Sequence, residues 1–243
     1  MKKTTLDRIL QSQGFGTRKG CRRLIREGAV AIAGATVSEF RDEIDPHGLV
    51  FSVKGEEWIV SEKIHLALNK PPGYECSRNP SHHPGVLSLL PEQFMLRDVQ
   101  PVGRLDHDTT GLLLLSDDGA FIHAQSSPRR RVPKVYIATT QDPVTPELVA
   151  RLISGVTLDD EPAPLSAQAR QIDAHTIEVV LEQGKYHQVK RMLAAAGNHC
   201  AALRRTAIGG LTLDALGIDV GQWCYLGEEQ LRLLVNRGQT TIS

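Results

Sequence analysis

Residues 102–119, with the sequence VGRLDHDTTGLLLLSDDG, constrain the fold more than any other stretch of this chain. The four consecutive leucines at 112–115 form a short, continuous apolar run, which is typical of a strand buried on both faces. The residues just before them, 108–111, are of the types that form turns and caps. A polar loop joined to a buried strand can hold a side chain rigidly. The stretch therefore predicts that Asp106 is a candidate catalytic carboxylate.

Two other readings of Asp106 are open at this level. An aspartate in a polar turn is most often only a turn former. The polar residues also match the spacing of an EF-hand calcium loop, at Asp106, Asp108, Thr110, Gly111 and Asp117. However, Pro101 and Gly103 stand where the entering helix of an EF-hand would lie, and this argues against calcium.

The string GRLDHDTTGLLLLSDDG resembles the catalytic-aspartate motif of the pseudouridine synthases that act on ribosomal RNA, in the form found in the branch named after RsuA. This resemblance implies that Asp106 is the nucleophile, and we expect Arg104 in the same string to contact RNA. It also implies an α+β fold whose catalytic domain has a mixed, mostly antiparallel sheet with flanking helices. No cofactor or metal is expected, and the protein is expected to be a monomer.

Three later strings resemble other motifs of the same family. KVYIA contains Tyr136, which the resemblance places against the target base, although a tyrosine there also suits a half-buried strand. HQVK contains Lys190, which the resemblance places beside the catalytic aspartate. LRRTAIGGL contains Leu203, which is expected to help wall the base pocket. The resemblance covers nearly the whole chain.

Helical periodicity predicts a helix over residues 186–196. Tyr186, Val189 and Leu193 would share one face of this helix, leaving a cationic face with His187 and Lys190. That second face is expected to close over an anionic site.

The first 60 residues resemble the S4 RNA-binding domain, with a helix over 6–13, a basic helix over 17–27 and short strands after it. Spacing places Arg18, Arg22 and Arg26 in one stripe on the basic helix, where they are expected to bind phosphates. A small helical domain with a solvated basic face is the plainer alternative. The chain is thus expected to consist of an S4-like domain, residues 1–60, and a catalytic domain, residues 61–243.

Formal net charge is zero, yet the charges are segregated. Residues 1–26 carry eight Lys or Arg and one acid. A second basic segment lies at 127–134, where Arg129 and Arg130 are expected to grip RNA phosphates. This segregation favours a polyanionic partner despite the neutral total.

No stretch approaches 18 apolar residues, and the start of the sequence has no signal-peptide core. The four cysteines are scattered without a close pair, which argues against a zinc site or a disulfide framework. The protein is therefore expected to be soluble and cytoplasmic, with no membrane association.

Conversion of uridine to pseudouridine requires a carboxylate nucleophile, a cation that keeps it ionised, and a stacked base. Asp106, Lys190 and Tyr136 supply one group of each kind. The expected substrate is 16S ribosomal RNA, either free or in a small-subunit assembly intermediate. The alternatives are a synthase acting on 23S rRNA and a non-catalytic S4-type RNA-binding or ribosome-assembly protein.

Overall fold

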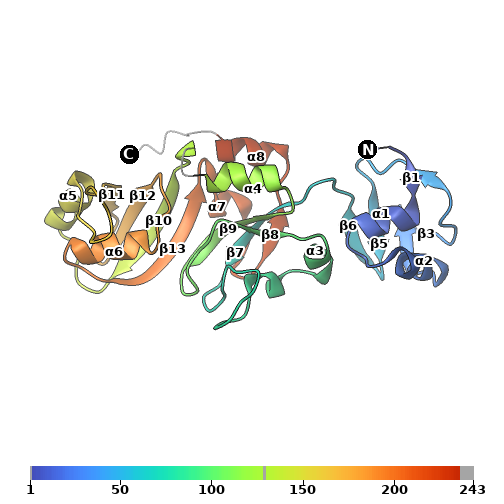
Figure 1. Cartoon of the computed structure of the whole chain (residues 1–243), viewed down its shortest axis with the longest axis horizontal. Coiled ribbons are helices and arrows are strands. Elements are labelled where there is room, and N and C mark those ends of the chain that lie inside the picture. Colours follow the sequence, from blue (N-terminus) through green and yellow to red (C-terminus); the bar gives the residue numbers. More distant parts are fainter. Residues whose placement is uncertain (1, 128–129, 236–243) are drawn as a thin grey trace. The chain divides into compact units, whose positions relative to one another are not determined.

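The computed structural model describes residues 2–127 and 130–235, which form two compact units (Figure 1). The first unit contains the described residues up to Ile64 together with Leu87–Gln100 and Ser116–Asp118, and the second contains the others. Two later segments therefore belong with the N-terminal residues. The division into domains at residue 60 concerns which parts fold independently, and it stays a prediction.

The two helices expected in the first unit are present. They are α1 (Leu6–Ser12) and α2 (Arg18–Arg26), and the Thr17 hydroxyl caps α2 by accepting a hydrogen bond from the backbone N–H of Gly20 at 3.2 Å. The strands form a β1–β4 pair and an antiparallel sheet in the order β3-β2-β5-β6. Their bounds are β1 Thr4–Thr5, β2 Val30–Ile32, β3 Ala35–Thr36, β4 Glu43–Ile44, β5 Val50–Val53 and β6 Glu56–Ile59.

A later segment completes the core of the first unit. After the 3-10 helix η1 (Val86–Leu89), α3 (Glu92–Leu96) places the Phe94 ring 6.0 Å from the Trp58 ring of β6, centroid to centroid. Gly14 is required for this approach, because a Cβ on it would lie 2.1 Å from the carbonyl oxygen of Gln93. The N-terminal residues thus bury their aromatic side chains against a helix that comes more than thirty residues later in the sequence.

Asp7 of α1 is a fully buried carboxylate. It accepts hydrogen bonds from Arg18 Nε and Arg22 Nε of α2, both at 2.7 Å, and from the Thr5 hydroxyl. Burial opposes ionisation of Asp7, but these three donors outweigh it and hold its pKa well below the usual range. The ion pairs therefore join α1 to α2.

The second unit contains a sheet whose strands run in the order β11-β12-β10-β13-β9-β7-β15, with β14 paired to β13 and β8 paired to β9. The pairings around β10, β11 and β12 are antiparallel, whereas β9 and β13 run parallel. The bounds are β7 His65–Lys70, β8 Gln100–Val102, β9 Thr110–Ser116, β10 Lys134–Thr140, β11 Gln168–Gln171, β12 Thr176–Leu181, β13 Cys200–Ile208, β14 Leu211–Thr212 and β15 Trp223–Tyr225. The expected mixed, mostly antiparallel α+β fold is confirmed.

Helices flank this sheet (Figure 1). Their bounds are α4 Gly119–Ser126, α5 Pro146–Ser154, α6 Gln188–Ala195, α7 Leu213–Leu216 and α8 Glu228–Val235. α5 contacts β11 and α6 contacts β13, at the end of the sheet where the antiparallel strands lie. No helix in the described part of the chain has the length and hydropathy needed to span a membrane.

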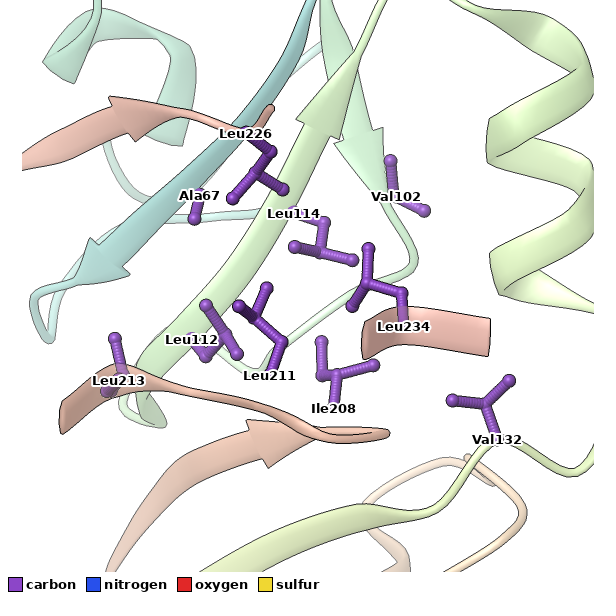
Figure 2. Close-up of a cluster of buried hydrophobic side chains, with 10 residues drawn as sticks. All are labelled: Ala67, Val102, Leu112, Leu114, Val132, Ile208, Leu211, Leu213, Leu226 and Leu234. Atoms are coloured by element: carbon purple, nitrogen blue, oxygen red, sulfur yellow. The ribbon is translucent and has the colours of Figure 1, made fainter. Parts of the chain in front are cut away.

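The buried strand predicted at 112–115 is β9, an interior strand of the sheet between β13 and β7. Its four leucines are each exposed by 1% or less, so both faces of β9 are covered. Figure 2 shows Leu112 and Leu114 on one face, packed among side chains from β7, β13, β14 and α8. Burial of one leucine side chain stabilises a fold by about 1.5–3 kcal/mol. This packing anchors the loop that precedes β9.

Asp7→Asn is expected to lower the free energy of unfolding of the first unit by about 2–4 kcal/mol at pH 7, since it leaves two arginines facing a neutral buried amide. The pKa of Asp7 is depressed, so its stabilisation is complete above about pH 4 and is lost as the pH falls further. The difference between wild type and variant should therefore shrink at pH 3.

The measurement is denaturant unfolding followed by Trp58 fluorescence in a Trp223→Phe background, at pH 7 and pH 3. Glu27→Gln is the matched control, because Glu27 forms only an exposed pair with Arg23 at 3.9 Å. An Asp7→Asn variant as stable as the control would show that the buried ion pairs do not hold the two helices together.

Candidate functional site

Asp106 lies in the loop between β8 and β9. A buried lysine donates hydrogen bonds to the backbone of this loop. Lys70, at the end of β7, has no solvent exposure. Its ammonium donates hydrogen bonds to the backbone carbonyls of Pro71, His107 and Thr109, at 3.1, 2.9 and 3.0 Å. The last two carbonyls lie one and three residues after Asp106, so Lys70 fixes the backbone that carries the carboxylate.

Burial lowers the pKa of Lys70, while the negative charges of Asp108 and Asp106 act in the opposite sense. Three carbonyl acceptors match the three N–H donors of an ammonium group. The sequence analysis did not single out Lys70, because a lysine that ends an apolar strand is ordinarily read as its solvated terminus.

His187 and Lys190, at the start of α6, face the Asp106 carboxylate. His187 Nε2 lies 3.2 Å from Asp106 Oδ1, and Lys190 Nζ lies 3.5 Å from Asp106 Oδ2. The Asp106 side chain is 25% exposed, so the carboxylate remains open to a substrate. The expected meeting of Asp106 and Lys190 is therefore found in the structure.

Lys190 is nevertheless bound more closely to another acid. Its ammonium donates to both oxygens of Asp108, at 2.7 and 2.8 Å. Burial opposes the charge of Lys190, but Asp108 and then Asp106 outweigh it and raise its pKa. Burial likewise opposes ionisation of Asp108, whereas Lys190 lowers the pKa of this carboxyl. One lysine thus serves two carboxylates, and the sequence analysis missed the second.

The prediction that a helix begins at residue 186 is wrong. α6 begins at Gln188, because His187 is in the left-handed conformation with φ of 45° and forms the N-cap position. Tyr186 is 69% exposed and stacks on the His187 ring, rather than sharing a buried face with Val189. Left-handed backbone is costly for a residue with a side chain, and here it turns the imidazole toward Asp106.

A cavity of about 160 Å³ adjoins Asp106. Its wall includes the predicted residues Arg104, Tyr136 and Leu203, of which Tyr136 and Leu203 are buried and Arg104 is exposed. His187 also lines it. The structure therefore brings Asp106, Tyr136, Leu203 and Arg104 around one space, with Lys190 bound to the Asp106 carboxylate.

Strand register brings two further cations to the cavity wall, Lys134 and Arg205. Tyr136 of β10 pairs directly with Arg205 of β13, next to an irregularity in the ladder. Side chains two residues apart on a strand share a face, so Lys134 lies beside Tyr136 and Leu203 beside Arg205. Lys134 belongs to the string KVYIA and Arg205 to the string LRRTAIGGL. Each lies two residues from a predicted site residue on the same strand, and this spacing could have indicated from the sequence that they share its face.

The remaining predicted residues lie elsewhere. Arg18, Arg22 and Arg26 belong to the first unit, and the first two are bound to Asp7. Arg130 is exposed, and Arg129 lies outside the described residues. Within the described ranges, no three His, Cys, Asp or Glu side chains are grouped so that they could hold a metal ion.

Comparison with known proteins gives consistent matches. Residues 64–195 match the RNA pseudouridylate synthase family. The chain is 34% identical over 233 residues to an uncharacterized RNA pseudouridine synthase of Bacillus subtilis, YtzG, covering 94% of this chain and 97% of that one. It is 40% identical over 231 residues to ribosomal small subunit pseudouridine synthase A of Salmonella typhimurium, covering 93% and 97%. A crystal structure of a pseudouridylate synthase matches 95% of this chain and 99% of its own, with a TM-score of 0.67 and 32% identity.

Lys70→Met is expected to loosen the Asp106 loop, because three carbonyl groups lose their charged donor and each such bond contributes about 1.5–3 kcal/mol. Amide hydrogen exchange of residues 105–111 should accelerate by about tenfold or more, corresponding to about 1.4 kcal/mol of local stability. Lys63→Met, at an exposed lysine, is the control. Unchanged exchange in the loop of Lys70→Met would show that the ammonium does not fix it.

Proposed function

Because the chain belongs to the RNA pseudouridylate synthase family, we propose that it isomerises one uridine of ribosomal RNA to pseudouridine with Asp106 as the nucleophile. The observation that carries the assignment of Asp106 is its position: an open carboxylate between His187 and Lys190, on the wall of a cavity that also contains Tyr136. The family membership expected from the GRLD string is confirmed. The S4-like identity of the first unit stays a prediction.

The substrate is ribosomal RNA of the small subunit, since the Salmonella relative carries that specificity in its name. The further proposals are that the protein acts as a monomer in the cytoplasm, on free 16S rRNA or on a small-subunit assembly intermediate. A synthase of 23S rRNA remains the alternative substrate class. A non-catalytic RNA-binding protein would have no use for an open carboxylate beside a cavity.

Two neighbouring side chains support Asp106 as the reacting group. Lys190 and His187 approach different oxygens of the carboxylate, so they orient it. Asp108 holds Lys190 in place from the other side. Asp106 attacks either the ribose or the uracil ring, after which the N-glycosidic bond breaks, the base turns, and carbon replaces nitrogen in the bond to the sugar.

The target uridine must leave its stack to reach Asp106, which costs a few kcal/mol. We assign Tyr136 and Leu203, both buried in the cavity wall, to contact with the extruded base. Stacking of a base on an aromatic ring returns about 1–3 kcal/mol. Arg104 is exposed and lines the same cavity, so it is placed to bind a phosphate next to the extruded nucleotide. Arg129 and Arg130 are proposed to grip phosphates farther along the RNA.

The direct test is to map pseudouridine in ribosomal RNA from cells that lack the protein. We expect loss of the modification at one site of 16S rRNA and its return when the wild-type chain is supplied. Loss at a 23S site instead would change the substrate, and an unaltered pseudouridine map would exclude the proposed activity on rRNA.

Asp106→Asn is expected to abolish pseudouridine formation while leaving RNA affinity nearly unchanged, since the amide keeps the shape of the carboxylate but cannot act as a nucleophile. Single-turnover assays at saturating RNA measure the first effect and filter binding the second. Residual turnover above a few per cent of the wild-type rate would remove Asp106 from this role.

The basic stripe of α2 is better tested at Arg26 than by deleting residues 1–60, because deletion would uncover Phe94 and because Arg18 and Arg22 stabilise Asp7. Arg26→Gln is expected to weaken RNA binding and to reduce the logarithmic salt slope by about 0.7–0.9, the value for one phosphate contact. The single-turnover rate at saturating RNA should not change. A salt slope equal to that of the wild type would mean that Arg26 does not touch RNA.

A further inference from the structure

Arg205 is a guanidinium enclosed in the second unit, with only 3% of its surface exposed. Its Nε–H donates a hydrogen bond to the carbonyl oxygen of Leu112 at 2.8 Å, across the parallel pair of β9 and β13. Gly111 makes this approach possible, because a Cβ there would lie 2.2 Å from the carbonyl oxygen of Arg205. The hydrogen bond to Leu112 therefore fixes the Nε end of the guanidinium.

The other end of Arg205 has no protein partner in the described part of the chain. Its Nη2 atom is buried and unbonded, and no acid of the described ranges forms an ion pair with the guanidinium. A buried N–H group without an acceptor costs about 1–3 kcal/mol, and more when it is charged. Nη2 itself has almost no accessible surface, so a ligand that enters the cavity would meet the small exposed part of Arg205 that lines it.

A second cation strengthens the positive character of this wall. Lys134 also lines the cavity, and its ammonium donates only to the backbone carbonyl of Val132 at 3.0 Å among the described residues. Burial and then the charge of Arg205 lower the pKa of Lys134 to about 8. The part of the cavity wall formed by Lys134 and Arg205 therefore favours an electron-rich ligand.

The position of Arg205 indicates which part of the substrate it meets. It pairs with Tyr136 across β10 and β13, and both side chains line the cavity. A base that packs on Tyr136 therefore lies against the guanidinium, whereas RNA phosphates stay outside with the exposed Arg104. The acceptors that a uracil ring presents are its carbonyl oxygens, O2 and O4.

Resting on the proposed function, we infer that Arg205 is a catalytic residue whose guanidinium donates to a carbonyl oxygen of the target uracil and stabilises the negative charge that the ring acquires during the reaction. Preorganised donors aimed at developing charge are among the largest contributions to enzymatic rates.

Both possible sites of attack by Asp106 place that charge on the ring. If Asp106 bonds to C1′, the N1–C1′ bond breaks and its electron pair stays on uracil, shared among N1, O2 and O4. If Asp106 adds to C6, the C5–C6 π electrons move toward O4. In both cases the later steps join C5 to C1′, release Asp106, and replace the proton lost from C5 by one gained at N1. Arg205 keeps its own proton throughout.

The experiment compares wild type, Arg205→Met and Arg205→Lys in single-turnover assays at saturating RNA, with RNA affinity measured separately. Arg205→Met should lower the rate by about 10²–10³-fold, as removal of one such donor does elsewhere. Affinity should stay within about twofold. Arg204→Met is the matched control, because the neighbouring Arg204 is exposed on the same strand, and its rate should match the wild type.

A second measurement separates catalysis from a structural role. RNA carrying 2-thiouridine or 4-thiouridine at the target replaces O2 or O4 by sulfur, which accepts hydrogen bonds weakly. One of the two should slow the wild type by a larger factor than it slows Arg205→Met, because the variant has already lost the donor. Arg205→Lys gives the same comparison if Arg205→Met does not fold.

Each outcome decides the inference. A wild-type rate in Arg205→Met, or equal thio effects in wild type and variant at both positions, would overturn the role of Arg205 while leaving the synthase activity intact. A wild-type chain that forms no pseudouridine in the RNA would overturn both. Unequal thio effects at one position would identify the oxygen that Arg205 binds.

Discussion

The buried ammonium of Lys70 is the interaction on which the candidate active site depends. It is charged, has no solvent exposure, and donates to three backbone carbonyls, two of which follow Asp106. The loop between β8 and β9 has little regular structure of its own, so without this donor the Thr109 carbonyl would lose its partner and the His107 carbonyl would keep only the Gly73 N–H, at 2.7 Å. The four buried leucines of β9 hold the far end of the same loop. A carboxylate in a mobile turn would be only a turn former, and these two restraints are what make Asp106 a candidate nucleophile.

The residues around the cavity form two groups of different charge. In the first, Asp106 and Asp108 share Lys190, and His187 contacts Asp106 as well. In the second, Arg205 and Lys134 line the cavity and have no acidic partner within the described residues. In the proposed reaction, Asp106 would supply the attacking electrons, and Arg205 and Lys134 would stabilise the charge that develops in the uracil ring. Such a layout is unfavourable in the empty protein, since a buried cation without a partner costs free energy.

In the first unit, two of the charged side chains on α2 stabilise the fold. Arg18 and Arg22 were expected to bind phosphates, yet both donate to the buried Asp7 and so stabilise the packing of α1 on α2. Arg22 and Arg26 also lie over the Phe40 ring, at 4.9 and 5.2 Å from its centroid. Because Arg18 and Arg22 are paired with Asp7, part of the basic stripe is structural, and counting all three arginines as free charges overstates the positive charge available to RNA. The restraint has one advantage, since a side chain that is already ordered loses less entropy when it binds a ligand.

Local patterns in the sequence determined much of this protein. The apolar run of β9, the helices α1 and α2, and the placement of Asp106 in a turn before a buried strand were all visible in it, because each depends on neighbours within about ten residues. Features that depend on contacts between residues far apart in the sequence could not be predicted from it. The start of α6 at Gln188 follows from the left-handed His187, whose ring meets Asp106. Only the register between β10 and β13 brought Arg205 opposite Tyr136, and only tertiary packing set Phe94 against Trp58. Strand register and the burial of a charge are settled by contacts between distant segments, which no local pattern records.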